Sequence, residues 1–191
     1  MTIKRATIQE QSLIKRLRDG DKVAAREFYA LYADYLAGIC ARYIADEEDQ
    51  KDVFQDAFVH ILTHINDFQY RGSGSLQAWA TKVMVNTSLK FLRTQQRHEF
   101  VSLDSDLTDE QEEDDPPVSD IPPDVVQQML SQLPAGYRTV FNLYVFEGKS
   151  HKEIAKLLDI KENSSASQLH RAKNLLAKMI QKYNNNHPSR Q

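Results

Sequence analysis

The chain has 191 residues, of which 41% are hydrophobic and 27% charged, which is enough apolar material for one large or two small globular domains. It contains no apolar run of the roughly 18 to 20 residues that a membrane span requires. Its start has no apolar stretch of signal-peptide type, so we expect a cytoplasmic protein. The single cysteine, Cys40, excludes an internal disulfide and a multi-cysteine zinc module, and we expect no cofactor.

The net charge of −3 conceals an uneven distribution of charge along the chain. Residues 99–120 contain ten of the 27 acidic residues and no Lys or Arg. Residues 67–98 have five basic residues against one acidic residue, and residues 149–191 have nine against three. Two basic stretches therefore flank an acidic one. This pattern is typical of a protein that contacts a polyanion, although a plain solvated surface fits the charges equally well.

The acidic stretch also predicts a division into two domains. Residues 99–120 include a Pro-Pro pair, contain few aliphatic residues and lack a helical period, so they cannot bury enough apolar surface to fold alone. We interpret them as a flexible linker between a first domain, residues 1–98, and a second domain, residues 121–185. Residues 186–191 are expected to form a disordered tail.

Two helices are predicted in the first 66 residues. Over residues 21–44, apolar side chains recur at the three-and-four spacing of one helix face, at Phe28, Leu31, Tyr32, Tyr35, Leu36, Ile39 and Tyr43. Residues 48–66 have an inner apolar stripe made of Val53, Phe54, Ala57, Phe58, Ile61, Leu62 and Ile65. Their outer polar stripe is made of Asp52, Gln55, Asp56, His60 and Thr63.

A glycine-containing loop precedes the next predicted helix. Gly72 and Gly74 interrupt the chain, and Ser75 can cap a helix whose apolar residues are Leu76, Trp79, Ala80, Val83 and Met84. Asn86 and Thr87 are poor residues for a helix interior, so we predict a short break there before a helix over residues 89–97.

Four helices are predicted after the linker, and the short β-branched runs offer no sheet, so the fold class is all-α. Pro134 ends the first helix and Gly148 the second, while Ser150 and Glu153 form a capping box that opens the third. The last helix is expected to bury Leu169, Ala172, Leu175, Leu176, Met179 and Ile180. It is expected to expose Ser164, Ser165, Ser167, Gln168, Arg171 and Lys178.

The last two helices have the pattern of a helix-turn-helix. A small residue, Ala155, lets them cross closely, and Ile160 fills the corner after the turn. The polar start of the second helix would enter a major groove, where short side chains face base edges and nearby Lys and Arg neutralise phosphates. An ordinary helical hairpin with a polar outer face is the alternative interpretation.

One face of the second predicted helix carries residue types that could bind a divalent metal. Asp52, Asp56, His60 and His64 recur every four residues and could offer ligands from one helix face. Since no second helix offers a matching cluster and the expected Glu-x-x-His pairs are missing, we expect a solvated or partner-binding face and no metal.

The combined motifs resemble those of bacterial sigma factors of the extracytoplasmic-function group, within the sigma-70 family. The resemblance rests on DVFQDAFVHIL, YRGSGSLQAWATKVMVNTSLKFLR, the acidic linker, and LPAGYRTVFNLYVFEGKSHKEIAKLLDIKENSSASQLHRAKNLL, in that order along nearly the whole chain. It implies two small helical domains. The first, region 2, would bind the clamp helices of RNA polymerase and the minus-ten promoter element. The second, region 4, would bind the polymerase flap and the minus-thirty-five element.

The resemblance also implies roles for three groups of residues. The polymerase-binding group is Asp52, Gln55 and Asp56. The minus-ten group is Trp79, Asn86, Thr87, Ser88 and Lys90. The last four match the break where the family captures a flipped base. Trp79 matches the family's tryptophan and could stack on unpaired bases, although it fits core packing better. The minus-thirty-five group is Ser164, Ser167, Gln168, His170 and Arg171.

The resulting prediction is a sigma factor that binds core polymerase, directs it to promoters and assists promoter melting. It would have no catalytic residue, no metal and no enzymatic activity, and an anti-sigma factor is an expected partner because the family commonly has one. The alternatives are a free-standing helix-turn-helix regulator, which would need a dimer surface and a palindromic operator, and the helical metal-dependent hydrolase.

The chain departs from the family pattern at the recognition helix. Residues 164–168 read Ser-Ser-Ala-Ser-Gln, where the family usually has Thr-Val-basic-Ser-Arg. Because Gln prefers adenine where Arg prefers guanine, the difference predicts a different promoter sequence. Asp159 replaces the usual turn glycine, which is tolerable because Asp adopts positive φ more readily than most residues.

Overall fold

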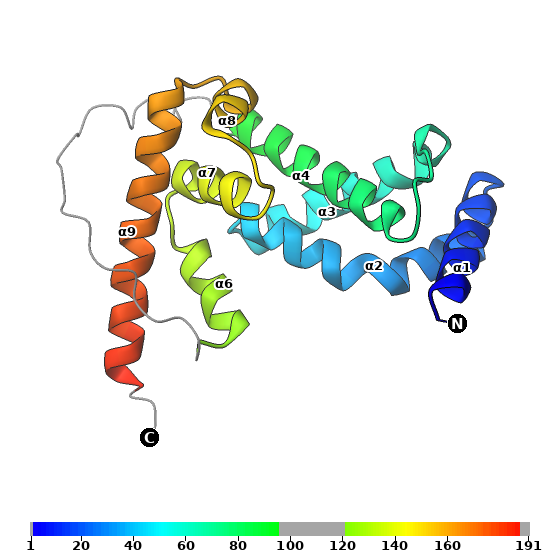
Figure 1. The fold of residues 1–191 in the computed structure, drawn as a ribbon, viewed down its shortest axis with the longest axis horizontal. Helices are drawn as coiled ribbons and strands as arrows, with labels where there is room; N and C mark the ends of the chain where they lie inside the picture. The colour runs from blue at the N-terminus through cyan, green and yellow to red at the C-terminus, as the bar shows by residue number, and fades with distance from the viewer. Residues whose placement is uncertain (1, 96–120, 188–191) are drawn as a thin grey trace. The chain divides into compact units, whose positions relative to one another are not determined.

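The computed structural model describes residues 2–95 and 121–187 of the chain (Figure 1). Every regular element within these residues is a helix, which confirms the predicted all-α class. The chain divides into two compact units, one ending at Phe91 and the other beginning at Leu92. The predicted linker, residues 99–120, lies outside the described residues, and so do the last four residues of the predicted tail.

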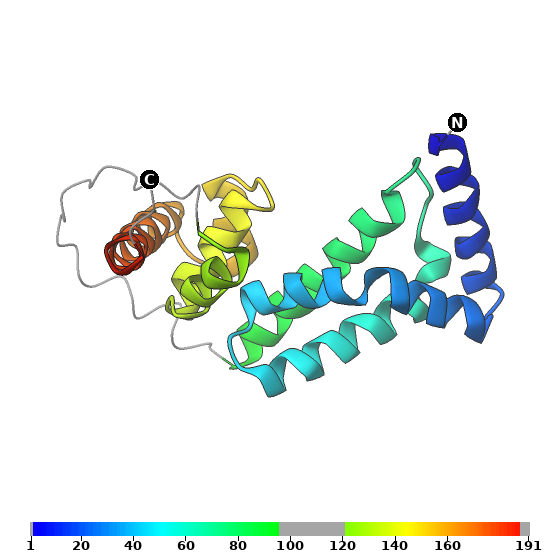
Figure 2. The ribbon, with the colours of Figure 1, turned by 90° about the horizontal axis from the view of Figure 1, so that it is seen from below.

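The first unit is built from four helices and a short 3-10 helix. These are α1 (Thr2–Arg18), α2 (Lys22–Tyr43), α3 (Glu47–Thr63), η1 (Ile65–Asp67) and α4 (Ser75–Gln95), of which the unit includes the part up to Phe91. In Figure 2, α2 and α3 run along each other, α4 passes behind α2, and α1 lies at the N-terminal end of α2. Helices α2 and α3 therefore correspond closely to the two helices predicted for this part of the sequence.

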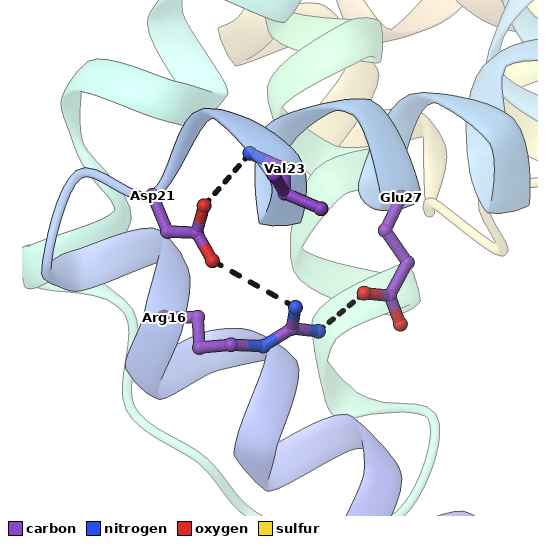
Figure 3. Close-up of polar contacts among 4 residues, drawn as sticks. All are labelled: Arg16, Asp21, Val23 and Glu27. Carbon is purple, nitrogen blue, oxygen red and sulfur yellow. Dashed lines mark hydrogen bonds and ion pairs between the residues drawn. The ribbon is translucent and has the colours of Figure 1, made fainter.

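Helix α1 was not identified in the sequence. Its last two turns bury Leu13, Ile14 and Leu17, and this apolar pattern spans too few residues to predict a helix of 17 residues. Arg16 links α1 to α2, because its guanidinium lies 3.8 Å from the Asp21 carboxylate and also pairs with Glu27 (Figure 3). Asp21 caps α2 by accepting the N–H of Val23 at 2.8 Å.

The core of the first unit confirms most of the predicted apolar faces. Helix α3 buries Val53, Ala57 and Ile61 and exposes its whole predicted polar stripe. Helix α2 buries a narrower face than predicted, since Leu31 and Tyr35 are 59% and 46% exposed. The α2 residues that the core does bury are Ala24, Phe28, Ala33, Leu36, Ile39, Cys40 and Tyr43.

Helix α4 is continuous, so the predicted break at Asn86 and Thr87 was wrong. The Thr87 hydroxyl donates to the carbonyl of Val83 at 2.9 Å, which keeps this polar side chain satisfied within the helix. Tertiary packing supplies the remaining stabilisation and outweighs the poor helix propensity of the two residues. The buried residues in this part of α4 are Val83, Met84, Val85, Ser88 and Leu89.

The second unit contains the four helices predicted after the linker. They are α6 (Pro123–Ser131), α7 (Ala135–Val145), α8 (His151–Leu158) and α9 (Glu162–Asn186). Helices α6, α7 and α8 each contact α9, the longest of them (Figure 1). The apolar residues buried where α6, α7 and α9 meet are Met129, Leu130, Leu133, Tyr137, Ala172 and Leu176.

Helices α8 and α9 form the predicted helix-turn-helix. The N–H of Ser150 donates to the Glu153 carboxylate at 2.9 Å and the N–H of Glu153 donates to the Ser150 hydroxyl at 3.3 Å, which confirms the capping box. The Ser150 hydroxyl also donates to the Glu153 carboxylate at 2.8 Å, and the two hydrogen bonds that this carboxylate accepts, from the N–H and the hydroxyl of Ser150, lower the pKa of Glu153. Asp159 ends α8 with φ of 57°, the left-handed conformation expected of it in the turn.

Replacement of Ser150 by alanine is expected to destabilise the second unit by about 1 kcal/mol, because the N–H of Glu153 loses its acceptor. Ser150→Thr keeps a capping hydroxyl and should recover most of the loss. Thermal unfolding of the full chain, followed by circular dichroism, provides the measurement. Equal stability of the alanine and threonine variants would contradict a capping role.

Candidate nucleic-acid interface

Three polar residues lie next to one another on the outer face of α3. Asp52, Gln55 and Asp56 are exposed and share one face at the i, i+3 and i+4 spacing, while Val53 and Ala57 on the opposite face are buried. A rigid helix that presents two carboxylates and an amide can pair with cationic and polar side chains of a partner protein.

The histidines further along this face stack on each other. The ring centroids of His60 and His64 lie 3.9 Å apart, and the Nδ1 atom of His64 lies 3.0 Å from the carbonyl oxygen of His60. In the part of the chain that the structure describes, no three His, Cys, Asp or Glu side chains gather closely enough to hold a metal ion. The metal-hydrolase alternative therefore gains no support from the geometry of α3.

Helix α4 carries the residues predicted to contact the minus-ten element. Asn86 and Lys90 are exposed, and Thr87 is half-buried. Ser88 corrects the prediction, because it is fully buried and its hydroxyl donates to the carbonyl of Met84 at 3.0 Å. It also hydrogen-bonds Cys40, whose pKa burial raises to about 11. Ser88 therefore packs α4 against α2 and does not face a DNA strand.

Trp79 packs inside the first unit. It is half-buried on α4, and its ring lies 5.3 Å from that of Phe68, centroid to centroid, at a tilt of 45°. This contact accords with the expectation that Trp79 fits core packing better than stacking on DNA.

The start of α9 offers a smaller polar face than predicted. His170 is exposed, and Ser164, Ser167 and Arg171 are half-buried. The Arg171 guanidinium donates to the hydroxyl of Tyr137 at 3.2 Å, so α7 helps to orient this cation. Serine, histidine and arginine side chains at the N-terminal part of a recognition helix are suited to hydrogen bonds with bases and phosphates.

Two predicted outer residues of α9 are buried instead. Ser165 is fully buried, and Gln168 is only 4% exposed. The Nδ1 atom of His151 lies 3.0 Å from the Ser165 hydroxyl, so this serine joins α8 to α9. Gln168 lies three residues later and shares the inward face. Its burial corrects the prediction that it reads a base, and the expected preference for adenine loses its basis.

Two residues of α1 that the sequence pattern did not reveal form hydrogen bonds with the segment that precedes α4 and with its first turn. Glu10 is buried, and its carboxylate accepts the N–H groups of Gly74 and Leu76. Arg18 donates to the carbonyls of Ile65 and Phe68. No local pattern could identify them, because their partners are 47 to 66 residues away in the sequence.

The geometry defines an all-α protein with a helix-turn-helix in its second unit and polar helix faces in both units. Two family models match the chain in the same order. The model described as Sigma-70 region 2 matches residues 28–98, and the one described as Sigma-70, region 4 matches residues 124–176. In the described residues, none of the helices is both long enough and apolar enough to cross a membrane.

Curated relatives resemble the chain over nearly its whole length. The RNA polymerase sigma-H factor of Pseudomonas aeruginosa is 27% identical over 184 residues, which cover 91% of this chain and 94% of the relative. The ECF RNA polymerase sigma-E factor of Haemophilus influenzae is 26% identical over 91% of this chain and 96% of the relative. The ECF RNA polymerase sigma factor SigW of Bacillus subtilis is 24% identical over 87% of this chain and 94% of the relative.

The chain belongs to the sigma-70 family, in its extracytoplasmic-function group. It is a sigma factor, which directs RNA polymerase to promoters, and the free-standing regulator is not favoured. Its partners are therefore core RNA polymerase and promoter DNA, and its family is not one of enzymes.

Proposed function

We propose that the first domain, residues 1–98, binds the polymerase clamp helices and the melted minus-ten element. The second domain, residues 121–185, binds the flap and the minus-thirty-five duplex. The observation that carries this division is that the region 2 match lies mostly on the first unit and the region 4 match entirely on the second, each unit with a polar helix face. Residues 99–120 would link the domains, and their ten acidic residues would be repelled by DNA.

The polymerase contact is assigned to Asp52, Gln55 and Asp56. Their support is their exposure on a helix whose other face is anchored in the core. Carboxylates on such a helix form charge-assisted hydrogen bonds with a cationic partner without having to rearrange the domain.

The minus-ten contact is assigned to Asn86, Thr87 and Lys90 on α4. Asn86 and Lys90 lie four residues apart on its exposed face, so an amide and a cation are available together to an unpaired strand. Since Thr87 already donates its proton to the Val83 carbonyl, its hydroxyl oxygen is proposed to act as an acceptor.

Alanine at Asn86 is expected to slow open-complex formation about tenfold and to weaken base selectivity on single-stranded minus-ten DNA, because hydrogen bonds to an unpaired base are lost. Thr87→Ala should have a smaller effect of the same kind. Permanganate reactivity of unpaired thymines measures the melting. Binding of core polymerase should not change, and Gln11→Ala, at an exposed residue of α1, is the control. Normal melting by both α4 variants would place the contact elsewhere.

The minus-thirty-five contact is assigned to Ser164, Ser167, His170 and Arg171. These residues lie on the first three turns of α9, the second helix of the helix-turn-helix. Lys and Arg in the basic stretch 149–191 supply the attraction to phosphates, so binding to duplex DNA should weaken as salt rises.

The decisive experiment is promoter-specific run-off transcription with core polymerase and the full chain. Promoters are first selected by the reconstituted holoenzyme from genomic DNA of the source organism. Transcripts that start at the selected sites only when the chain is present support the proposal, and their absence would contradict it. The chain is proposed to act in the cytoplasm, where an anti-sigma factor would compete with polymerase for it, and to contribute no catalytic group.

A further inference from the structure

The connection between α3 and α4, residues 64–74, is held at both ends by side chains of α1. Neither contact falls within one local segment, since the bonded residues are separated by 47 to 66 positions in the sequence. Helix α1 also precedes the residues matched by the region 2 family model, which begin at residue 28. Each contact therefore joins a residue before the matched region to a residue inside it.

Arg18 holds the first end of the connection. Its guanidinium donates to the carbonyl of Phe68 at 2.5 Å and to that of Ile65 at 3.5 Å. These carbonyls belong to η1 and its C-terminal cap, and the Ile65 carbonyl also accepts the N–H of Phe68 at 3.3 Å. Phe68 is buried and its ring packs on Trp79 of α4, so Arg18 also fixes a residue that α4 contacts.

Glu10 holds the second end. One carboxylate oxygen accepts the N–H of Gly74 at 2.9 Å, and the other accepts the N–H of Leu76 at 3.0 Å. Gly74 and Leu76 flank Ser75, the first residue of α4, so the carboxylate satisfies amides at the positive end of the helix. Glu10 is 8% exposed, which makes these charge-assisted bonds stronger than they would be in water.

Between these two ends, the backbone is one that few residues can adopt. Gly72 and Gly74 have φ of 120° and 84°, values that favour glycine, and glycine loses more conformational freedom on ordering than other residues do. Inside the connection, the N–H of Arg71 donates to the Ser75 hydroxyl at 3.2 Å. The shape of such a segment depends strongly on what holds its ends.

We propose that Glu10 and Arg18 are positioning residues for minus-ten recognition, because together they fix the start of α4 and the segment that leads into it. The inference rests on the proposed role of α4. Arg71 belongs to this segment and is one of the five basic residues of the stretch 67–98, so holding the segment in place fixes the backbone that presents its cation to an unpaired strand. Neither Glu10 nor Arg18 needs to touch DNA itself.

The test compares holoenzymes reconstituted from core polymerase and full-length Glu10→Gln or Arg18→Gln. The probes are two single-stranded oligonucleotides, one with the minus-ten sequence that wild-type holoenzyme selects from a randomised pool and one with the same bases scrambled. Each variant is expected to lose about tenfold in the ratio of the two affinities, since each loses charge-assisted hydrogen bonds. Affinity for core polymerase should remain at the wild-type value.

The controls remove the same charges from exposed positions. Asp34→Asn on α2 and Lys15→Gln on α1 should leave the affinity ratio unchanged. If both Glu10→Gln and Arg18→Gln keep the wild-type ratio of the two affinities, the positioning role is overturned. If Asn86→Ala lowers the ratio in that case, the proposed function of α4 stands, and if it does not, both proposals fail.

Folding is checked by far-UV circular dichroism and thermal unfolding. A merely structural role predicts lower stability with an unchanged affinity ratio, and that result would also overturn the proposal. If one variant does not fold, the other decides, because the two contacts hold opposite ends of the segment. If neither folds, the residues serve the fold itself and the proposal is wrong.

Discussion

Charge reversal at Asp52 and Asp56, as Asp52→Lys with Asp56→Lys, is expected to weaken binding of core polymerase by about 3 kcal/mol, on the order of a hundredfold. Both carboxylates are exposed on one face of α3, so no contact within the domain has to break when a cation replaces them. The loss arises because the new cations would face the basic groups that we propose the carboxylates bind. Competition with labelled wild-type chain for core polymerase measures the affinity.

The control for this experiment is Asp34→Lys, which reverses an exposed charge on α2. It should bind core polymerase nearly as wild type does. Gln55→Ala is expected to show a smaller loss than the double reversal, because it removes a neutral hydrogen-bonding group. Wild-type affinity of the double variant, with its helical content intact, would rule out the outer face of α3 as the clamp contact.

The sequence predicted the fold well wherever a long period and a local cap agreed. In α3, the inner stripe that includes Val53 and the outer stripe that includes Asp52 repeat over the whole helix, so both faces could be assigned. The capping box of Ser150 and Glu153 also involves only neighbouring residues. Helix α1 was missed because long-range contacts, such as that of Glu10 with Leu76, hold it in place.

The candidate site was harder to predict, because a polar residue in a helical pattern is assigned to the exposed face. Ser88 and Gln168 are polar, yet both are buried, and each lies between a half-buried residue and a buried leucine. A serine hydroxyl can bond to the carbonyl four residues earlier, which lets it enter a core at little cost. The polar pattern alone therefore could not separate Ser88, which packs inside, from its exposed neighbour Lys90.

The same limit explains the departure at the recognition helix. Ser165, which stands where the family usually has valine, was expected to be exposed, but it is buried and its hydroxyl lies 3.0 Å from the Nδ1 atom of His151. Tyr144, which is 41% exposed, stacks on the His151 ring at 4.8 Å between centroids, so the pair of Ser165 and His151 joins α8 to α9 beneath an exposed aromatic side chain. The substitution thus changes how α8 joins α9, while DNA contacts remain proposed for the residues beside it.

Replacement of Arg138 by methionine is expected to destabilise the second unit by about 3 kcal/mol. Arg138 is only 5% exposed, and burial lowers its pKa, but an arginine remains charged at any ordinary pH. Its guanidinium donates to the carbonyl of Ser131, the last residue of α6, at 2.8 Å and to that of Leu133, which lies between α6 and α7, at 3.1 Å. Methionine fills similar space but donates no hydrogen bond, so two carbonyls lose a charged partner.

Calorimetry of the full chain measures this loss, because the two units can unfold in separate transitions. Only the transition of the second unit should shift to lower temperature, and duplex minus-thirty-five binding should fall with it. Lys182→Met, which removes an exposed positive charge from α9, is the matched control and should change the unfolding temperature little. An Arg138→Met variant as stable as the control would mean that the carbonyls of Ser131 and Leu133 are satisfied without the guanidinium. The buried charge would then cost as much in desolvation as its hydrogen bonds return.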